Sequence, residues 1–173
     1  MKIIKTKQQM RFVGLALWLL SVTVFAQNTI NKDKLKFNSF SITPLEVFLT
    51  DNDGGASITG ELSYSYGKHI FTFSATVGET IAVFGRGDRF QQLNILYGRA
   101  LKLKEWFFID TNAGVGLFLY NNGNNRFSEI GIPLVAKFRF KTGDKFSIGI
   151  KLQANINRID NIYSAGLLLQ WNY

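Results

Sequence analysis

Apolar and polar residues alternate along most of this chain with a period of two. The clearest case lies near the C-terminal end, where the even-numbered positions from Phe146 to Ile156 are apolar and the positions between them are Ser, Gly, Lys, Gln and Asn. The final segment, 162–173, repeats the pattern with odd-numbered apolar positions. Residues two apart share one face of a strand but not of a helix, so the pattern predicts β-structure.

The same period predicts an all-β chain with eight strands. Pro44 interrupts the first of them, and neither face of that segment is cleanly apolar, which predicts a bend or bulge there. The expected strands cover residues 39–49, 56–66, 69–78, 90–100, 106–119, 128–140, 145–156 and 162–173.

Two short connections agree with the faces that flank them. The apolar face changes from even-numbered to odd-numbered across Gly67-Lys68, which fits a two-residue type II′ turn that pairs Tyr66 with His69. The apolar positions are even-numbered both before and after 141–144, which requires an odd number of residues in the loop between the two strands. This predicts a three-residue loop, 141–143, with Gly143 in the left-handed conformation.

Connection lengths alternate between the two ends of the predicted strands. Short connections are expected at 67–68, 101–105 and 141–144, and mostly longer ones, richer in Asn, Gly and Asp, at 50–55, 79–89, 120–127 and 157–161. Short periplasmic turns and longer outer loops are typical of bacterial outer-membrane barrels. The sequence therefore predicts a transmembrane up-and-down antiparallel β-barrel with both ends of the chain on the short-turn side.

The less apolar face carries charges of both signs. A Lys or Arg at the bilayer midplane costs about 2 to 4 kcal/mol, so we expect this face to point into the barrel and the apolar face to meet lipid. Asp110 and Lys137 should pair across a hairpin centred near 123–124. Glu46 is a further inward carboxylate, and the predicted interior charge network consists of Glu61, Asp110, Glu129, Lys137, Arg139 and Lys151.

Aromatic residues gather near the predicted short-turn end, where they would form an interfacial girdle. They are Tyr64, Tyr66, Phe71, Trp106, Phe107, Phe138, Phe140, Phe146, Trp171 and Tyr173. The alternative hypothesis is a soluble periplasmic β-barrel whose apolar face points inward around a small apolar ligand.

The first 26 residues have the pattern of a secretory signal peptide. Lys2, Lys5, Lys7 and Arg11 precede an uncharged run over 12–26, and small residues before Gln27 predict cleavage between Ala26 and Gln27. An uncleaved anchor is the rival interpretation, but the run is short for a membrane span. The predicted organisation is thus a signal peptide at 1–26, a flexible periplasmic lead-in at 27–38 and a barrel domain at 39–173.

Composition narrows the function classes. Removing 1–26 takes four of the 20 basic residues, which leaves 16 against 12 acidic residues, or +4. That excess is modest and unclustered, so nucleic-acid binding is not expected. The chain has no cysteine and one histidine, His69, which argues against thiolate sites, metal sites and a histidine-based catalytic triad. We predict no enzyme activity and no cofactor.

Residues 39–173, and above all the closing segment Leu167–Tyr173, resemble the small outer-membrane β-barrel family that includes OmpX-like and OmpA-transmembrane-like proteins. The resemblance implies an outer-membrane location in a Gram-negative cell, with membrane lipid and periplasmic chaperones as partners. It also implies that Leu169, Trp171 and Tyr173 form a C-terminal signal for the barrel assembly machinery. Members of this class include adhesins, anchors, small channels and a few lipid-modifying enzymes.

One outer segment carries a candidate interaction motif. Arg86, Gly87 and Asp88 lie in the longest predicted outer loop and match a tripeptide that resembles integrin ligands. A tripeptide has low specificity, and a flexible Gly-rich loop is the preferred interpretation of this segment. We therefore predict a structural or surface-interaction role through the outer loops, with an unidentified extracellular partner.

Overall fold

The computed structural model describes residues 34–50, 53–81, 88–122, 125–158 and 161–173. The predicted signal peptide, and the lead-in up to residue 33, lie outside the described residues. Within the described ranges, no helix has the length and apolar character needed to cross a membrane.

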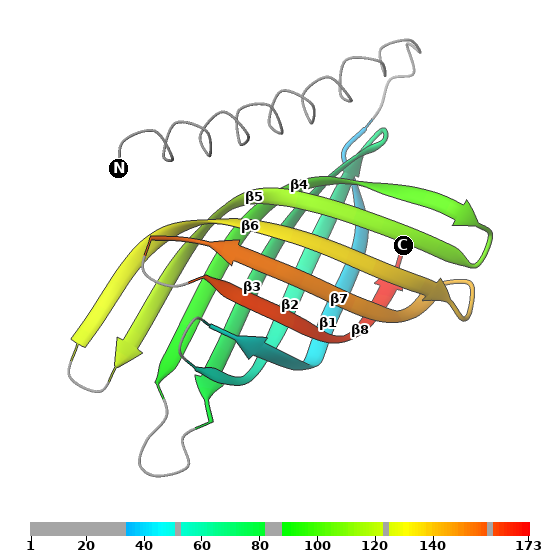
Figure 1. Ribbon diagram of the computed structural model, residues 1–173. Coiled ribbons are helices and arrows are strands. Elements are labelled where there is room, and N and C mark those ends of the chain that lie inside the picture. Colours follow the sequence, from blue (N-terminus) through cyan, green and yellow to red (C-terminus); the bar gives the residue numbers. More distant parts are fainter. Residues whose placement is uncertain (1–33, 51–52, 82–87, 123–124, 159–160) are drawn as a thin grey trace, which may run out of the picture. The chain divides into compact units, whose positions relative to one another are not determined.

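Eight strands form one closed antiparallel barrel in chain order, and β8 pairs with β1 to close it (Figure 1). This confirms the predicted fold class and strand number. The strands are β1 (Lys36–Leu49), β2 (Gly54–Tyr66), β3 (His69–Thr80), β4 (Arg89–Lys104), β5 (Phe107–Asn122), β6 (Asn125–Lys141), β7 (Phe146–Ile156) and β8 (Ile162–Asn172).

Two hairpins are longer than the alternation predicted. β4 continues to Lys104, so the connection expected at 101–105 is mostly strand, and the pairing of β5 with β6 continues to Asn122 opposite Asn125. The outer connection expected at 120–127 is therefore also mostly strand. Backbone hydrogen bonds hold a ladder together whatever the side chains are, so pairing extends beyond the apolar part that periodicity detects.

The two predicted turns have different outcomes. Gly67 has a φ of 59° and Tyr66 pairs with His69, which confirms the two-residue turn. The β6–β7 loop does hold an odd number of residues, because the Thr142 N–H donates to the Phe146 carbonyl oxygen at 3.1 Å and encloses three residues. These are 143–145 rather than 141–143, and Gly143 does not have a positive φ, so that part of the prediction was wrong.

A bulge in β1 explains why neither face of that strand looked apolar. The register of β1 against β2 shifts between Thr43 and Glu46, on either side of Pro44, as the proline predicted. Before the bulge the odd-numbered residues are buried, and after it the even-numbered Glu46 and Phe48 are buried. The inward-facing positions thus change from odd-numbered to even-numbered within β1.

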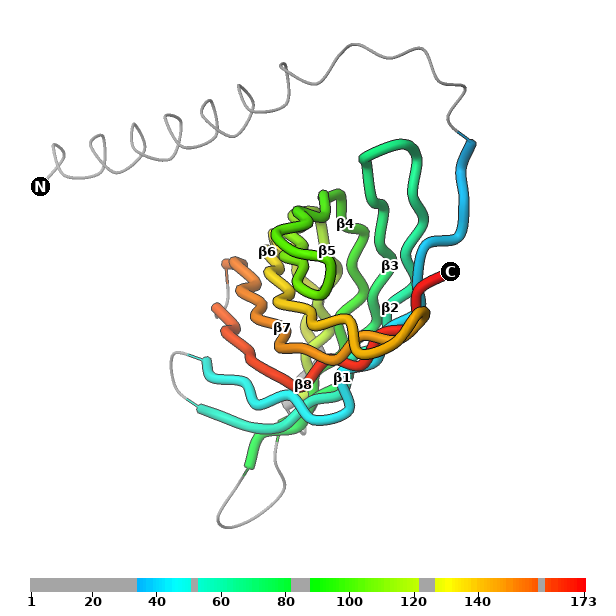
Figure 2. Tube along the Cα trace, turned by 90° about the vertical axis from the view of Figure 1, so that its right-hand side faces the viewer, coloured from blue at the N-terminus to red at the C-terminus, as the bar shows by residue number. Residues whose placement is uncertain are grey.

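Both described ends of the barrel chain lie at the end that carries the three short turns. The Tyr173 N–H donates to the Asn38 carbonyl oxygen at 2.9 Å, beside the start of β1. Figure 2 shows β3 to β7 running side by side as one continuous wall. We refer below to the turn end, which holds 67–68, 105–106 and 142–145, and to the loop end opposite it.

Candidate functional site

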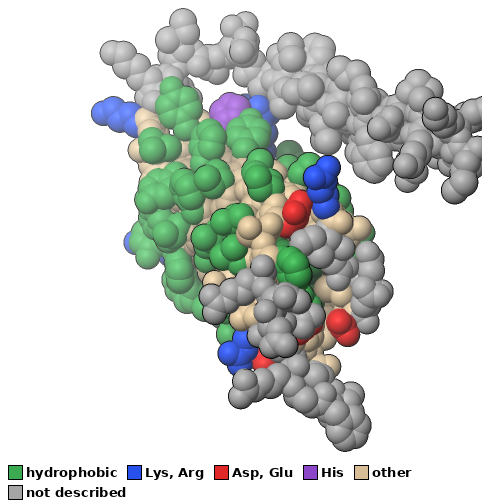
Figure 3. Space-filling view, turned by 90° about the vertical axis from the view of Figure 1, so that its left-hand side faces the viewer, with side chains coloured by type: hydrophobic (Ala, Val, Ile, Leu, Met, Phe, Trp, Pro, Cys, Tyr) green, Lys and Arg blue, Asp and Glu red, His purple; other side chains and the backbone are tan. Residues whose placement is uncertain are grey.

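The outer surface of the barrel is an apolar belt. Large aliphatic side chains are exposed there: Ile95 is 62% exposed and Ile130 68%. A contiguous apolar surface of this kind is unfavourable in water and marks a site of contact with lipid or protein. In Figure 3, hydrophobic side chains cover much of the visible face. The belt includes Ile58, Leu62, Phe73, Val77, Leu93, Ile95, Val115, Leu117, Ile130, Ile132, Leu134, Ile150, Leu152 and Leu167.

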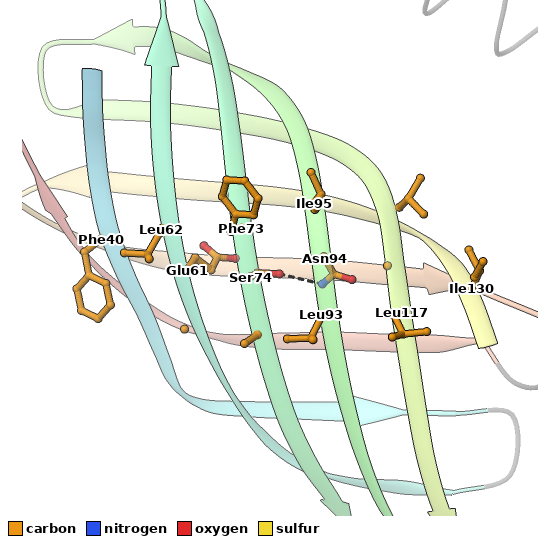
Figure 4. Close-up of a pocket in the computed structure, with 14 residues that line it drawn as sticks. Phe40, Glu61, Leu62, Phe73, Ser74, Leu93, Asn94, Ile95, Leu117 and Ile130 are labelled. Atoms are coloured by element: carbon orange, nitrogen blue, oxygen red, sulfur yellow. Dashed lines mark hydrogen bonds between the residues drawn. The ribbon is translucent and has the colours of Figure 1, made fainter. Parts of the chain in front are cut away.

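A depression in the described surface lies in this belt and not in the lumen (Figure 4). It measures about 790 Å³ and is lined mainly by apolar side chains, among them Leu62, Phe73 and Leu93. A side chain at Gly60 would meet nothing within 4 Å, so this glycine leaves the depression open. Its apolar lining on the lipid-facing side suits hydrocarbon chains, not a ligand enclosed by the barrel.

The interior is polar, opposite to what the soluble-barrel alternative requires. Inward positions hold mostly Ser, Thr, Asn, Gln and charged residues, nearly all buried. A barrel that binds an apolar ligand in its centre would have the reverse arrangement. The distribution is that of a barrel with lipid outside and a side-chain-filled polar lumen.

Four charged residues from four strands meet near the middle of the lumen. Glu61 of β2 accepts a short hydrogen bond from Lys137 of β6. Lys151 of β7 places its Nζ 3.6 Å from Glu61 Oε1 and 3.5 Å from Oε1 of Glu46 in β1. All four side chains are at most 3% exposed. Two cations and two anions therefore neutralise each other inside the barrel.

A second ion pair lies nearer the turn end. Arg139 of β6 forms a bidentate contact with Asp110 of β5, with Nη2 donating to Oδ1 at 2.8 Å and Nε donating to Oδ2. The guanidinium carbon also lies 5.3 Å from the ring centroid of Phe108. The planar guanidinium matches the two carboxylate oxygens, which makes this the geometrically stronger type of pair.

The expected pair between Asp110 and Lys137 was wrong, although the register behind it was right. The two residues are direct cross-strand partners in β5 and β6. Nevertheless Lys137 bonds to Glu61 across the lumen, and Asp110 bonds to Arg139, two residues farther along β6. In a narrow barrel a long side chain reaches the opposite wall, so adjacency in the ladder does not decide the partner.

Glu129 does not join the network, which corrects another prediction. It lies half-buried near the loop end, opposite Phe118 in the β5–β6 ladder, and forms no ion pair with any residue the structure describes. Glu46 belongs to the network instead, since its carboxylate accepts hydrogen bonds from Thr59 at 2.6 Å and from Ser164. The β1 bulge turns Glu46 inward.

Aromatic rings close the lumen toward the loop end, a feature that the sequence analysis missed. The rings of Phe48 and Phe90 meet edge to face with centroids 4.9 Å apart, and Phe90 stacks on Phe118 at 5.4 Å. Ile162 completes this buried cluster. The sequence did indicate this position for Phe118, because its spacing of two continues the inward series Asp110, Asn112, Gly114 and Gly116.

Glycines make room for these rings. A Cβ at Gly78 would lie 2.4 Å from an atom of the Phe90 ring, and a Cβ at Gly55 would lie 2.5 Å from the Phe48 ring. Both glycines face the lumen on strands next to the rings they accommodate. The aromatic cluster therefore depends on close approach of ring to backbone, which only glycine permits.

The candidate interaction motif is only partly described. Arg86 and Gly87 lie outside the described residues. Asp88 is anchored to the barrel: its N–H donates to Thr80 Oγ1 at 2.8 Å, and its carboxylate accepts a hydrogen bond from the Tyr120 hydroxyl. Tyr120 in turn stacks on Phe118 of the aromatic cluster. The Asp88 carboxylate thus already has a partner within the protein.

The closing strand carries the predicted assembly residues on its lipid-facing side. Trp171 stacks on Phe40 with centroids 5.9 Å apart and also meets Phe146 at 5.2 Å, and the Tyr173 ring lies 5.0 Å from that of Phe37. Leu169 pairs with positions on both neighbouring strands. These contacts belong to an aromatic girdle at the turn end, which also includes Tyr64, Phe71, Tyr97, Trp106, Phe107 and Phe140.

His69 has a local structural partner. Its Nδ1 lies 2.6 Å from the Tyr97 hydroxyl, and the two rings are stacked, at the turn end of β3 and β4. Among the described residues, no three His, Asp or Glu side chains are grouped closely enough to hold a metal ion.

Sequence comparison finds no matching family model and no matching curated protein. The structure is similar to Neisserial surface protein A (TM-score 0.64, 7% identity, covering 82% of this chain and 100% of that one). It is similar to Ail, the attachment invasion locus protein of Yersinia pestis (0.53, 10%, 82% and 99%), and to the outer membrane enzyme PagL (0.52, 15%, 78% and 99%). The chain therefore has the fold of a small outer-membrane β-barrel.

Proposed function

We propose that the protein is a non-enzymatic barrel of the outer membrane that meets its partners outside the cell through the connections at the loop end. The observation that supports this most is the state of the lumen. Its buried charges neutralise each other, and aromatic rings fill it toward the loop end. The side chains that remain accessible to a partner outside the cell are those of the connections, and connecting loops commonly carry the function of a protein.

Export with removal of residues 1–26 belongs to the same proposal. A barrel with an apolar outer belt reaches the outer membrane only after crossing the inner one, and the basic and apolar segments at the start of the chain suit that route. N-terminal sequencing of the mature protein should begin at Gln27. A mature protein that begins at Met1 would contradict the proposed cleavage.

The enzymatic alternative has a structural precedent in PagL but weaker support in this chain. Acyl-group chemistry needs a base beside a nucleophile. The chain's one histidine lies at the turn end, stacked on Tyr97. Incubation of the purified protein with lipopolysaccharide should leave the acyl chains unchanged by mass spectrometry. Loss or gain of an acyl chain would overturn the non-enzymatic proposal.

Surface binding can be tested by separating the two ends of the barrel. Wild-type protein in nanodiscs should bind at least one component of an array of extracellular glycans and matrix proteins. A variant with residues 81–87 replaced by a Gly-Ser linker of equal length should lose that binding, whereas the turn variant Lys68→Ser should retain it. Equal binding by both variants, or no binding by the wild type, would contradict a role for this connection.

A further inference from the structure

The turn end of the barrel is strongly basic. Six basic side chains lie around its three turns against two acidic ones, Glu105 and Asp144, and Lys34 and Lys36 add two more at the start of β1. We call the six the basic collar: Lys68, Arg99, Lys102, Lys104, Lys141 and Lys145. At the loop end the balance is reversed, since four described acidic side chains face two described arginines there.

Most of the collar lysines are free to bind a partner. Lys102 is paired with Glu105 at 2.6 Å, but both side chains are at least half exposed, and such surface pairs exchange readily. Lys68, Lys141 and Lys145 are exposed and form no ion pair with any described residue. The collar therefore carries uncompensated positive charge.

The collar coincides with the aromatic girdle. Lys104 places its Nζ 5.7 Å from the ring centroid of Trp106, and Trp106 stacks on Phe140. Indole and phenol rings mark the headgroup level of a membrane, where long basic side chains also extend toward the interface. These lysines consequently lie at the depth at which lipid phosphates lie.

Arg99 adds a side chain that faces the lipid directly. It follows Tyr97 and precedes Leu101 on the outward side of β4, opposite Thr111. Its Nε is buried and has no hydrogen-bond partner among the described residues. A guanidinium in that position is suited to bind a phosphate through two parallel hydrogen bonds.

We propose that the basic collar selectively binds anionic phospholipid headgroups in the periplasm-facing leaflet of the outer membrane. Collar residues come from all three turns, so they encircle the barrel instead of forming a patch on one side. A leaflet contacts a barrel along its whole circumference, whereas a docked protein or glycan contacts one side. Anionic lipid therefore fits this distribution better than a macromolecular ligand.

Competition between lipids tests the proposal. Full-length protein is incorporated into vesicles of phosphatidylcholine mixed with increasing phosphatidylglycerol, either lipid carrying brominated chains that quench tryptophan fluorescence. Trp18 is changed to Phe so that only the two turn-end tryptophans, Trp106 and Trp171, contribute. Their quenching should report a local phosphatidylglycerol enrichment of about tenfold in 20 mM salt, reduced by 500 mM salt. Neutralising the collar with Lys68, Lys102, Lys104, Lys141 and Lys145→Gln and Arg99→Gln should bring the enrichment close to one.

Two matched variants keep the result interpretable. Arg89→Gln with Arg158→Gln removes charge from the loop end and should leave the enrichment unchanged, and replacing the five lysines with arginine should preserve it. Folding of each variant is checked by its faster migration on unheated gels. If the variant with all six collar residues changed to Gln does not fold, Arg99→Gln alone should lower the phosphatidylglycerol enrichment at least twofold. No enrichment in the wild type, or full enrichment without the collar, would overturn the proposal.

Discussion

Asp110 and Lys137 stand directly opposite each other in the β5–β6 ladder, yet each forms its ion pair with a different residue. Asp110 binds Arg139 and Lys137 binds Glu61. Ion-pair partners inside this barrel are therefore not decided by direct opposition in the ladder: Lys137 reaches across the lumen, and Asp110 binds a residue two positions farther along the neighbouring strand.

A pair of double-mutant cycles distinguishes the two arrangements. Asp110→Asn and Arg139→Gln should each destabilise the barrel by about 3 to 5 kcal/mol, because each leaves a buried charge without its partner, and the double change should cost much less than their sum. Asp110→Asn and Lys137→Gln should be additive within about 0.5 kcal/mol. Urea unfolding in lipid vesicles measures both cycles, and strong coupling only in the second would contradict the observed pairing.

Two inward-facing glutamates should differ sharply when neutralised. Glu61→Gln leaves Lys137 without a carboxylate and weakens the environment of Lys151, so we expect a loss of about 3 kcal/mol or more in the free energy of unfolding. Glu129→Gln removes no ion pair with a described residue and should cost less than about 0.5 kcal/mol. Similar losses for the two variants would show that Glu129 belongs to the network after all.

Steric fit of the aromatic cluster can be tested at Gly78. Gly78→Ala places a Cβ 2.4 Å from an atom of the Phe90 ring and should cost about 1 to 3 kcal/mol. Adding Phe90→Leu should recover part of that loss, since it removes the colliding ring atoms. Gly60→Ala is the control, because its Cβ would meet nothing within 4 Å. If the two alanine variants unfold at the same urea concentration, the proposed close approach is absent.

Much of this architecture follows from periodicity alone, because one face of each strand must be apolar for lipid. Strand number, the hairpin register and the two-residue turn at Gly67 were predictable in this way. Pro44 indicated the bulge in β1, and Glu46 was expected to face inward, but its pairing with Lys151 was not predicted.

Partner choice inside the lumen was not predictable from the sequence. It depends on the distance across the barrel and on side-chain length, neither of which ladder adjacency gives, as the separate partners of Asp110 and Lys137 show. The aromatic cluster was missed for a different reason. Phe118 was assigned to neither face, although it continues the inward positions of β5 and so indicated the lumen.

Assembly should depend on the aromatic residues of the closing strand. Trp171→Ser or Tyr173→Ser should reduce the amount of folded barrel in membranes several-fold, because these residues join the girdle and form the proposed recognition signal. Phe127→Ser is a matched control: Phe127 is an exposed aromatic residue in β6 near the loop end. Heat-modifiable gel migration of membrane fractions measures folded protein. Equal losses from the changes at the two ends would remove the special role of the closing strand.

Orientation across the outer membrane is the central claim, and cysteine labelling tests it most directly. The chain has no cysteine of its own, so Asp53→Cys at the loop end and Lys68→Cys at the turn end each introduce a unique thiol. A membrane-impermeant maleimide should label Asp53→Cys on intact cells and Lys68→Cys only after the outer membrane is permeabilised. Labelling of Lys68→Cys alone on intact cells, or recovery of both variants in the soluble periplasmic fraction, would contradict this account.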